Sequence, residues 1–193
     1  MGTSKPKPPA HVEWAKHLRE KVPGDTIRAI RHHHDTEERS IDIFISENSE
    51  GSVAATIGIM DYDQSAGGGE PLATEVVVDA RGPVPYVSNV AATIAFYIMR
   101  EGWKVRPDNT FLDVIELYAP KLQVRHVLFV PPYQWEDGMT RVTLSDRTIY
   151  PLLAVPITDG ELDLIERDGA AALTGLWERS STDMLDWTRE GVV

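Results

Sequence analysis

The longest apolar stretch of the chain, from Val87 to Met99, predicts a buried helix. Its apolar residues recur three and four positions apart, so they share one wide face of a helix that runs from Tyr86 to Glu101 and ends at Gly102. The members of this face are Val87, Val90, Ala91, Ile94, Ala95, Ile98 and Met99. Polar residues interrupt the stretch, which makes it unsuited to crossing a membrane. The helix is therefore expected to pack inside the protein.

The segments around this helix predict the strands of a sheet. The clearest pattern runs from Ser40 to Glu47, where Ile41, Ile43 and Ile45 alternate with residues of the opposite face. Further strand patterns cover residues 27–32, 53–60, 72–78, 124–130, 140–144 and 148–155. The polar residues 35–38 suit a hairpin between the first two strands.

Helices are predicted near both ends of the chain. Trp14, Leu18 and Val22 recur at helical spacing before a Pro-Gly-Asp stop. Thr158 and Glu161 predict a capping box, in which each side chain satisfies a free amide at the start of a helix. Residues 170–178 continue as helix after a glycine, and residues 183–189 are expected to form a short helical turn.

These elements predict an α+β fold: a mixed, mostly antiparallel sheet packed against the central helix and the C-terminal helices. A chain of 193 residues can bury one substantial core but is short for two domains. Residues 1–10 are rich in proline and lysine, so we expect a flexible N-terminal leader and a single domain over residues 11–193. The leader lacks the apolar core of a signal peptide, which favours a cytoplasmic location.

Composition restricts the partners and the chemistry. The chain has no cysteine, which excludes disulfides, thiolate nucleophiles and cysteine-based metal sites. Its formal net charge of −11 repels nucleic acid and anionic lipid and attracts a basic partner, although the same charge also serves solubility. No cofactor is indicated.

No motif predicts catalysis. The glycines at positions 67–69 are not followed by the Gly-Lys-Ser/Thr of a phosphate-binding loop. Asp61, Asp63 and Glu70 around them lack the ordered spacing of a calcium loop, so a solvated hairpin tip is the better interpretation. Nucleophile motifs are also missing, and we expect no catalytic residues.

A histidine cluster carries the alternative hypothesis of a metal-dependent enzyme. On a strand, His32 and His34 would share a face, as in many His-x-His metal sites. Asp42 or His126 would then supply a third ligand. The competing interpretation is a solvated strand end, because histidine runs without further ligands are weak signals. A pocket for a small molecule between sheet and central helix ranks below both hypotheses.

The loop after residues 124–130 is the predicted binding site. It carries Tyr133 and Trp135, ring types that are enriched at interface hot spots, followed by Glu136 and Asp137, which suit a basic partner. The alternative is that one or both rings cover the end of the core. Trp177 and Trp187 have core-like spacing and are expected to be buried.

Short motifs from residue 41 to residue 177 resemble the Suppressor of fused domain family. The closing part resembles it most, with Ala154 to Leu162 followed by Glu166 to Gly169 and Leu173. The upstream motifs are Ile41-Asp42-Ile43, Thr56 to Asp61, Thr74-Glu75-Val76 and Pro131-Pro132, where Ile59 before Met60 departs from the family's Thr-x-Gly-Met pattern.

This resemblance implies a protein-binding role. The animal member of the family sequesters a transcription factor between two domains, and bacterial relatives are thought to be immunity proteins that neutralise polymorphic toxins. The chain resembles only the single shared domain, so the two-domain clamp does not carry over. We expect an immunity-type or adaptor protein that sequesters a basic partner such as a toxin.

Overall fold

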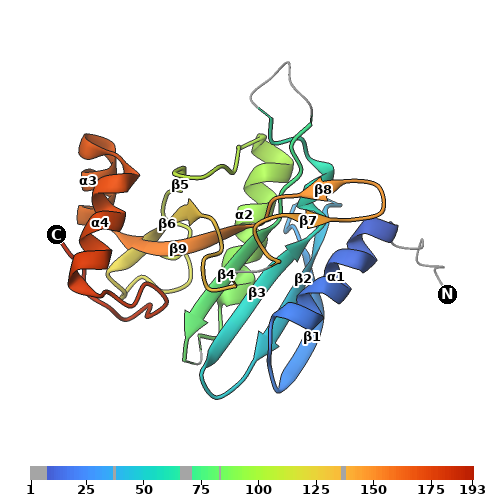
Figure 1. Cartoon of the computed structure of the whole chain (residues 1–193), viewed down its shortest axis with the longest axis horizontal. Helices are drawn as coiled ribbons and strands as arrows, with labels where there is room; N and C mark the ends of the chain where they lie inside the picture. The colour runs from blue at the N-terminus through green and yellow to red at the C-terminus, as the bar shows by residue number, and fades with distance from the viewer. Residues whose placement is uncertain (1–7, 37, 66–70, 83, 136–137) are drawn as a thin grey trace.

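The computed structural model describes residues 8–36, 38–65, 71–82, 84–135 and 138–193, and within them seven strands form one sheet (Figure 1). The strand order is β1-β2-β3-β4-β9-β6-β5. The bounds are β1 Thr26–His33, β2 Ser40–Glu47, β3 Gly51–Ile57, β4 Val76–Arg81, β5 Thr110–Phe111, β6 Val124–Val130 and β9 Leu152–Thr158. Among these strands the parallel pair is β4 with β9, and the other pairs are antiparallel. The predicted α+β fold with a mostly antiparallel sheet is confirmed.

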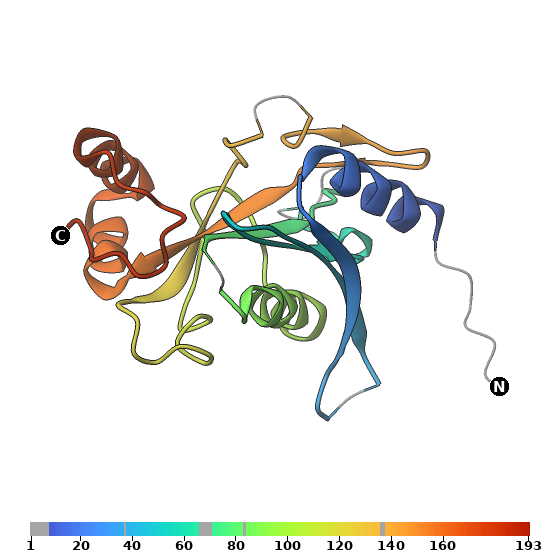
Figure 2. The same ribbon diagram turned by 90° about the horizontal axis from the view of Figure 1, so that it is seen from below.

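Helices cover both faces of the sheet. The central helix α2, Val87–Glu101, lies against one face, and α1, Pro9–Lys21, lies against the other face together with the ribbon of β7, Val142–Thr143, and β8, Thr148–Ile149 (Figure 2). The alternation along β2 divides its side chains between these layers: Ile43 packs on the α2 side and Phe44 on the α1 side. The core is therefore split into two layers by the sheet.

The C-terminal helices stand at one end of the molecule. Helix α3, Asp159–Asp168, continues directly from β9, and α4, Ala170–Ser180, follows after Gly169 (Figure 1). The predicted capping box is confirmed, because the Glu161 amide donates to Thr158 Oγ1 while the Thr158 amide donates to Glu161. No helix in the part of the chain that the structure describes is long and apolar enough to cross a membrane.

Several element boundaries differ from the sequence prediction. The third strand ends at Ile57 rather than continuing to residue 60, because Gly58 has a φ of 128° and starts the short 3-10 helix η1, Ile59–Asp61. The predicted strand over residues 148–155 is divided into β8 and β9 by Pro151, which has no amide hydrogen to give a ladder. The leader predicted for residues 1–10 lies mostly outside the described residues, as do most of the residues around the glycines at 67–69.

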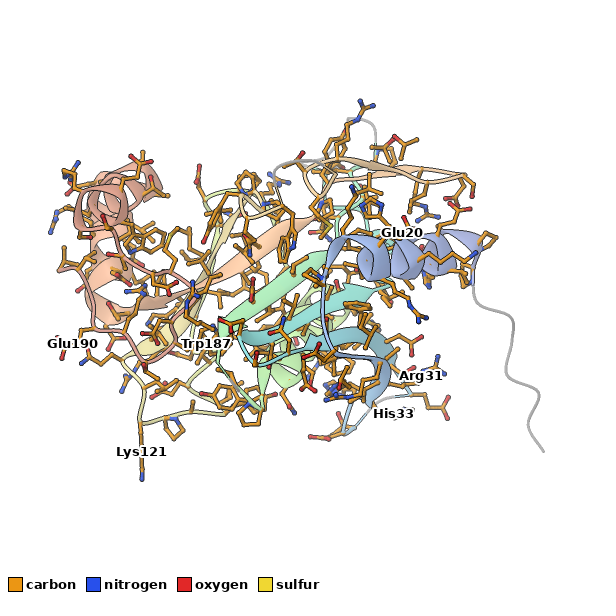
Figure 3. The ribbon with its side chains drawn as sticks, turned by 60° about the horizontal axis from the view of Figure 1, so that its bottom comes forward. Glu20, Arg31, His33, Lys121, Trp187 and Glu190 are labelled. Carbon is orange, nitrogen blue, oxygen red and sulfur yellow. The ribbon has the colours of Figure 1, made fainter. Side chains whose placement is uncertain are left out.

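Residues 183–189 form turns where a helical turn was predicted. Asp183 Oδ1 accepts from the Leu185 amide at 3.1 Å, and Asp186 Oδ1 accepts from the Thr188 amide at 2.8 Å. These side chains satisfy the backbone locally and so compete with helix formation. Trp187 is nonetheless buried, as predicted, and lies near the middle of the molecule (Figure 3).

A buried ion pair between Arg189 and Glu161 links the C-terminal segment to α3. Arg189 donates from Nη1 to Glu161 Oε1 at 2.6 Å and from Nη2 to Glu161 Oε2 at 2.8 Å. The Trp177 indole also donates to Glu161 Oε1 at 3.1 Å. Burial acts to raise the pKa of Glu161, but the bonds from Arg189 and from the Thr158 amide outweigh it, and the pKa is lowered. The carboxylate is therefore charged and paired inside the protein.

A second buried glutamate holds the turn after β3. The carboxyl group of Glu75 accepts from the Gly58 amide at 2.7 Å and from the Met60 amide at 3.2 Å, and it is hydrogen-bonded to Thr56 Oγ1. Glu75 is fully buried, and this burial raises its pKa to about 8 despite the hydrogen bonds. Because no cation contributes to that shift, the environment of Glu75 differs from that of Glu161.

Candidate protein-binding site

The loop after β6 carries the aromatic residues predicted for binding. Tyr133 is 43% exposed, whereas Trp135 is partly buried and packs against the core on the α1 side of the sheet. The Trp135 amide donates to the Pro132 carbonyl at 3.4 Å, which curls the loop back on itself. Tyr133 is therefore accessible to a partner, and Trp135 has part of its surface covered. Glu136 and Asp137, the acidic residues of the predicted site, lie outside the described residues.

Gln134, between the two rings, attaches this loop to β4. Its Nε2 donates to Asp79 Oδ2 at 3.0 Å. The main-chain oxygen of Asp79 accepts from the Trp187 indole at 2.9 Å, so β4 also holds the C-terminal segment here. Gln134 Oε1 is buried and has no hydrogen-bond partner among the described residues. The contact that fixes the loop thus leaves one acceptor unused.

The surroundings of the loop raise the pKa values of Asp79 and Tyr133. Burial raises the pKa of Asp79, and the hydrogen bond from Gln134 offsets only part of this effect. Burial also raises the pKa of Tyr133 to about 12, and the nearby carboxylates Asp79 and Asp183 add to the shift. Tyr133 therefore keeps its hydroxyl proton at neutral pH. Arg81, the neighbouring cation, is paired with Asp183.

The loop and β4 line a surface pocket of about 240 Å³. Its walls include Trp135 and Gln134 from the loop, Asp79 and Arg81 from β4, and Glu50 from the turn between β2 and β3. Sequence reasoning identified Trp135 but missed Asp79, because Asp79 directly follows the strand predicted over residues 72–78 and is far from the loop in sequence. The signal for it was a lone carboxylate directly after three buried valines.

The predicted histidine pair lies at another cleft, between β1 and α2. His32 and His34 line this cleft of about 410 Å³ together with His33, which Figure 3 labels on β1 beside Arg31. The His34 ring meets Phe96 of α2 edge-on, with 5.2 Å between the ring centroids. Burial lowers the pKa of His32, and the neighbouring His33 lowers it further. His32 is therefore uncharged at neutral pH.

The residues considered as a third metal ligand are engaged elsewhere. Asp42 accepts from Arg31 Nε at 2.8 Å and from Nη2 at 3.0 Å. His126 accepts from the Asp113 amide through Nδ1 at 2.9 Å, so its Nε2 carries the proton and donates to Asp159 Oδ1 at 2.8 Å. Within the described residues, no group of three or more His, Cys, Asp or Glu side chains is placed to hold a metal ion. The described residues therefore do not supply the set of ligands that the metal hypothesis requires.

Comparison with known proteins establishes the family. Residues 37–190 match the family model described as Suppressor of fused protein (SUFU). The chain belongs to the Suppressor of fused protein family. It is also 30% identical over 174 residues to "Immunity protein YqcF" of Bacillus subtilis (strain 168), in a match that covers 88% of this chain and 91% of that protein. The resemblance noted in the sequence is confirmed.

Solved structures share the fold of this Suppressor of fused family member. A SUFU homolog from Neisseria gonorrhoeae superposes with a TM-score of 0.75 at 16% identity, over 95% of this chain and 97% of the other. A chain of the Sufu-Fu complex gives a TM-score of 0.60 at 14% identity, over 96% of this chain and 93% of that one. Drosophila Suppressor of Fused gives 0.59 at 13% identity, and there the match spans 52% of the longer chain. The fold thus occupies about half of that protein.

Proposed function

We propose that this chain is an immunity-type protein that binds a basic partner protein, holds it inactive, and catalyses no reaction. The observation that carries the proposal is the match to Immunity protein YqcF, which extends over 91% of that protein and 88% of this chain. A match of this extent covers most of both proteins. Binding through one or more of these surfaces is the function that accounts best for the chain.

The charge of the chain supports a basic partner. Thirty carboxylates against nineteen Lys and Arg residues give a formal net charge of −11. A field of this sign raises the rate at which a cationic protein meets the chain, and it suppresses encounters with acidic proteins. Fast encounter suits a protein that must neutralise a toxin before the toxin acts.

The Tyr133–Trp135 loop is the surface that we propose for contact. Tyr133 is an exposed ring that keeps its phenolic proton, and the charges of Asp79 and Asp183 contribute to its raised pKa. An aromatic anchor beside acidic groups suits the tight binding of a basic surface. Trp135, two residues along the same loop, packs against the core on the α1 side of the sheet.

The first test measures neutralisation and its salt dependence. The chain is co-expressed with each basic toxic protein encoded by the same genome, and growth is compared with cells that express the toxin alone. We expect restored growth, and an association rate that falls at least about tenfold as NaCl rises from about 0.01 M to about 1 M, because the screening length falls from about 30 Å to about 3 Å. Failure to restore growth or to bind the toxin would overturn the proposal.

A matched pair of variants tests the contact surface. Tyr133→Ala is expected to weaken binding of that toxin about 30-fold, the effect of losing a typical hot-spot ring. Tyr150→Ala removes a ring of nearly equal exposure, 41% against 43%, and is expected to change the dissociation constant less than about threefold. Titration calorimetry of both variants makes the comparison. Equal effects of the two changes would place the contact away from the loop.

A further inference from the structure

The pocket beside the Tyr133–Trp135 loop has the size of a single side chain. Its volume is about 240 Å³, below the range of roughly 300–1,000 Å³ that is typical of small-molecule sites. It lies on the surface between the loop, the end of β4 and the turn from β2 to β3. A side chain that projects from a docked protein fits this space better than a free metabolite.

The walls of the pocket offer hydrogen-bond acceptors. Asp79 presents a partly buried carboxylate whose charge is poorly solvated, as its raised pKa indicates, and Glu50 adds a second carboxylate at the rim. Gln134 donates to Asp79 and leaves its own Oε1 buried without a partner among the described residues. A buried acceptor without a donor costs free energy, which an entering donor would recover. Arg81, the cation in the wall, already donates to Asp183.

The Trp135 side chain in the pocket favours a planar cationic donor over a compact one. Trp135 is partly buried and lines the pocket. A guanidinium group stacks on an indole and keeps its N–H donors free in the ring plane, whereas an ammonium group is compact and more strongly hydrated. We propose that this pocket receives an arginine side chain of the basic partner, held between the Trp135 ring and the Asp79 and Gln134 acceptors. The inference rests on the proposed function.

The experiment titrates the full chain with N-acetyl-arginine amide and follows the Trp135 indole and Gln134 side-chain amide resonances by NMR. The arginine probe is expected to shift both resonances and to bind in the millimolar range. The neutral isostere N-acetyl-citrulline amide is expected to bind at least tenfold more weakly, and N-acetyl-lysine amide at least threefold more weakly. If the citrulline probe binds as well as the arginine probe, the proposed arginine pocket is overturned. The proposal is also overturned if the arginine probe shifts only resonances other than those of Trp135 and Gln134. Lysine that binds equally well would overturn the choice of arginine.

Two variants separate a local site from the general field of the protein. Asp79→Asn keeps an acceptor for Gln134 but removes the charge, and it is expected to weaken arginine binding at least tenfold. Glu178→Gln removes one exposed carboxylate of α4 that does not line the pocket, and it is expected to change binding less than twofold. Equal losses in the two variants would contradict a built site. The citrulline comparison needs no variant, so it decides the matter even where Asp79→Asn does not fold.

The outcome is independent of the neutralisation test. Toxin neutralisation without arginine binding would overturn the pocket and leave the proposed function intact. Arginine binding in a chain that neutralises no toxin would overturn the function and retain the pocket.

Discussion

Replacing Arg189 with methionine is expected to lower the free energy of unfolding by about 3–5 kcal/mol. Glu161 is fully buried, and Arg189 supplies two of the hydrogen bonds that its carboxylate receives. The variant would leave this charge without a counter-ion, with the Trp177 indole, the Thr158 amide and the Val192 amide as donors. A buried charge that loses its partner keeps its desolvation cost, so the loss exceeds that of an ordinary hydrogen bond.

Urea unfolding of three further variants isolates this charge effect. Arg167→Met removes an arginine whose partner Asp168 is exposed, and it is expected to cost less than about 1 kcal/mol. The double variant Arg189→Met with Glu161→Gln removes both charges and is expected to recover most of the stability lost in Arg189→Met. Glu161→Gln alone completes the double-mutant cycle, which gives the interaction energy between the two residues. Near-equal effects of Arg189→Met and Arg167→Met would show that the buried pair contributes little.

Local periodicity predicted the elements of this fold but not their order in the sheet. The stripe from Val87 to Met99 and the alternation in β2 depend on the spacing of neighbouring residues, and both elements were predicted almost to the residue. The placement of β9 between β4 and β6 depends on pairing between segments far apart in the chain. No local pattern encodes such a pairing, because it is decided by which apolar faces bury one another best.

The candidate site was predictable only in part for the same reason. Tyr133 and Trp135 were identified because their residue types and their loop position are visible in the sequence. Asp79 belongs to a different strand, and its contact with Gln134 joins residues that only the tertiary fold brings together. His126 shows the reverse error: it was considered as a metal ligand by residue type, and in the structure it donates to Asp159 at the start of α3.

Glu75 should make the protein less stable as the pH rises from about 5 to about 8. In the folded state its pKa is about 8, raised by burial, against an ordinary value of 4.5. Between these values the folded chain holds one more proton than the unfolded chain, so raising the pH favours unfolding by about 1.4 kcal/mol per pH unit. The paired Glu161 has a pKa lowered from its ordinary value of 4.5, so its effect on stability appears below that pH, where stability is lost as the pH drops. The two buried glutamates therefore act in separate pH windows.

Glu75→Gln is the variant that tests this effect. An amide has the shape of the protonated carboxyl group, so its oxygen accepts from the Gly58 and Met60 amides and its nitrogen donates to Thr56. Urea unfolding at pH 5.5 and pH 7.5 should show the variant gaining about 2–3 kcal/mol on the native chain between the two conditions. Glu20→Gln, which removes an exposed carboxylate of α1, should show no such gain. A constant difference between Glu75→Gln and the native chain would mean that Glu75 is ionised in the folded protein, and the turn after β3 would then be held by a charged group.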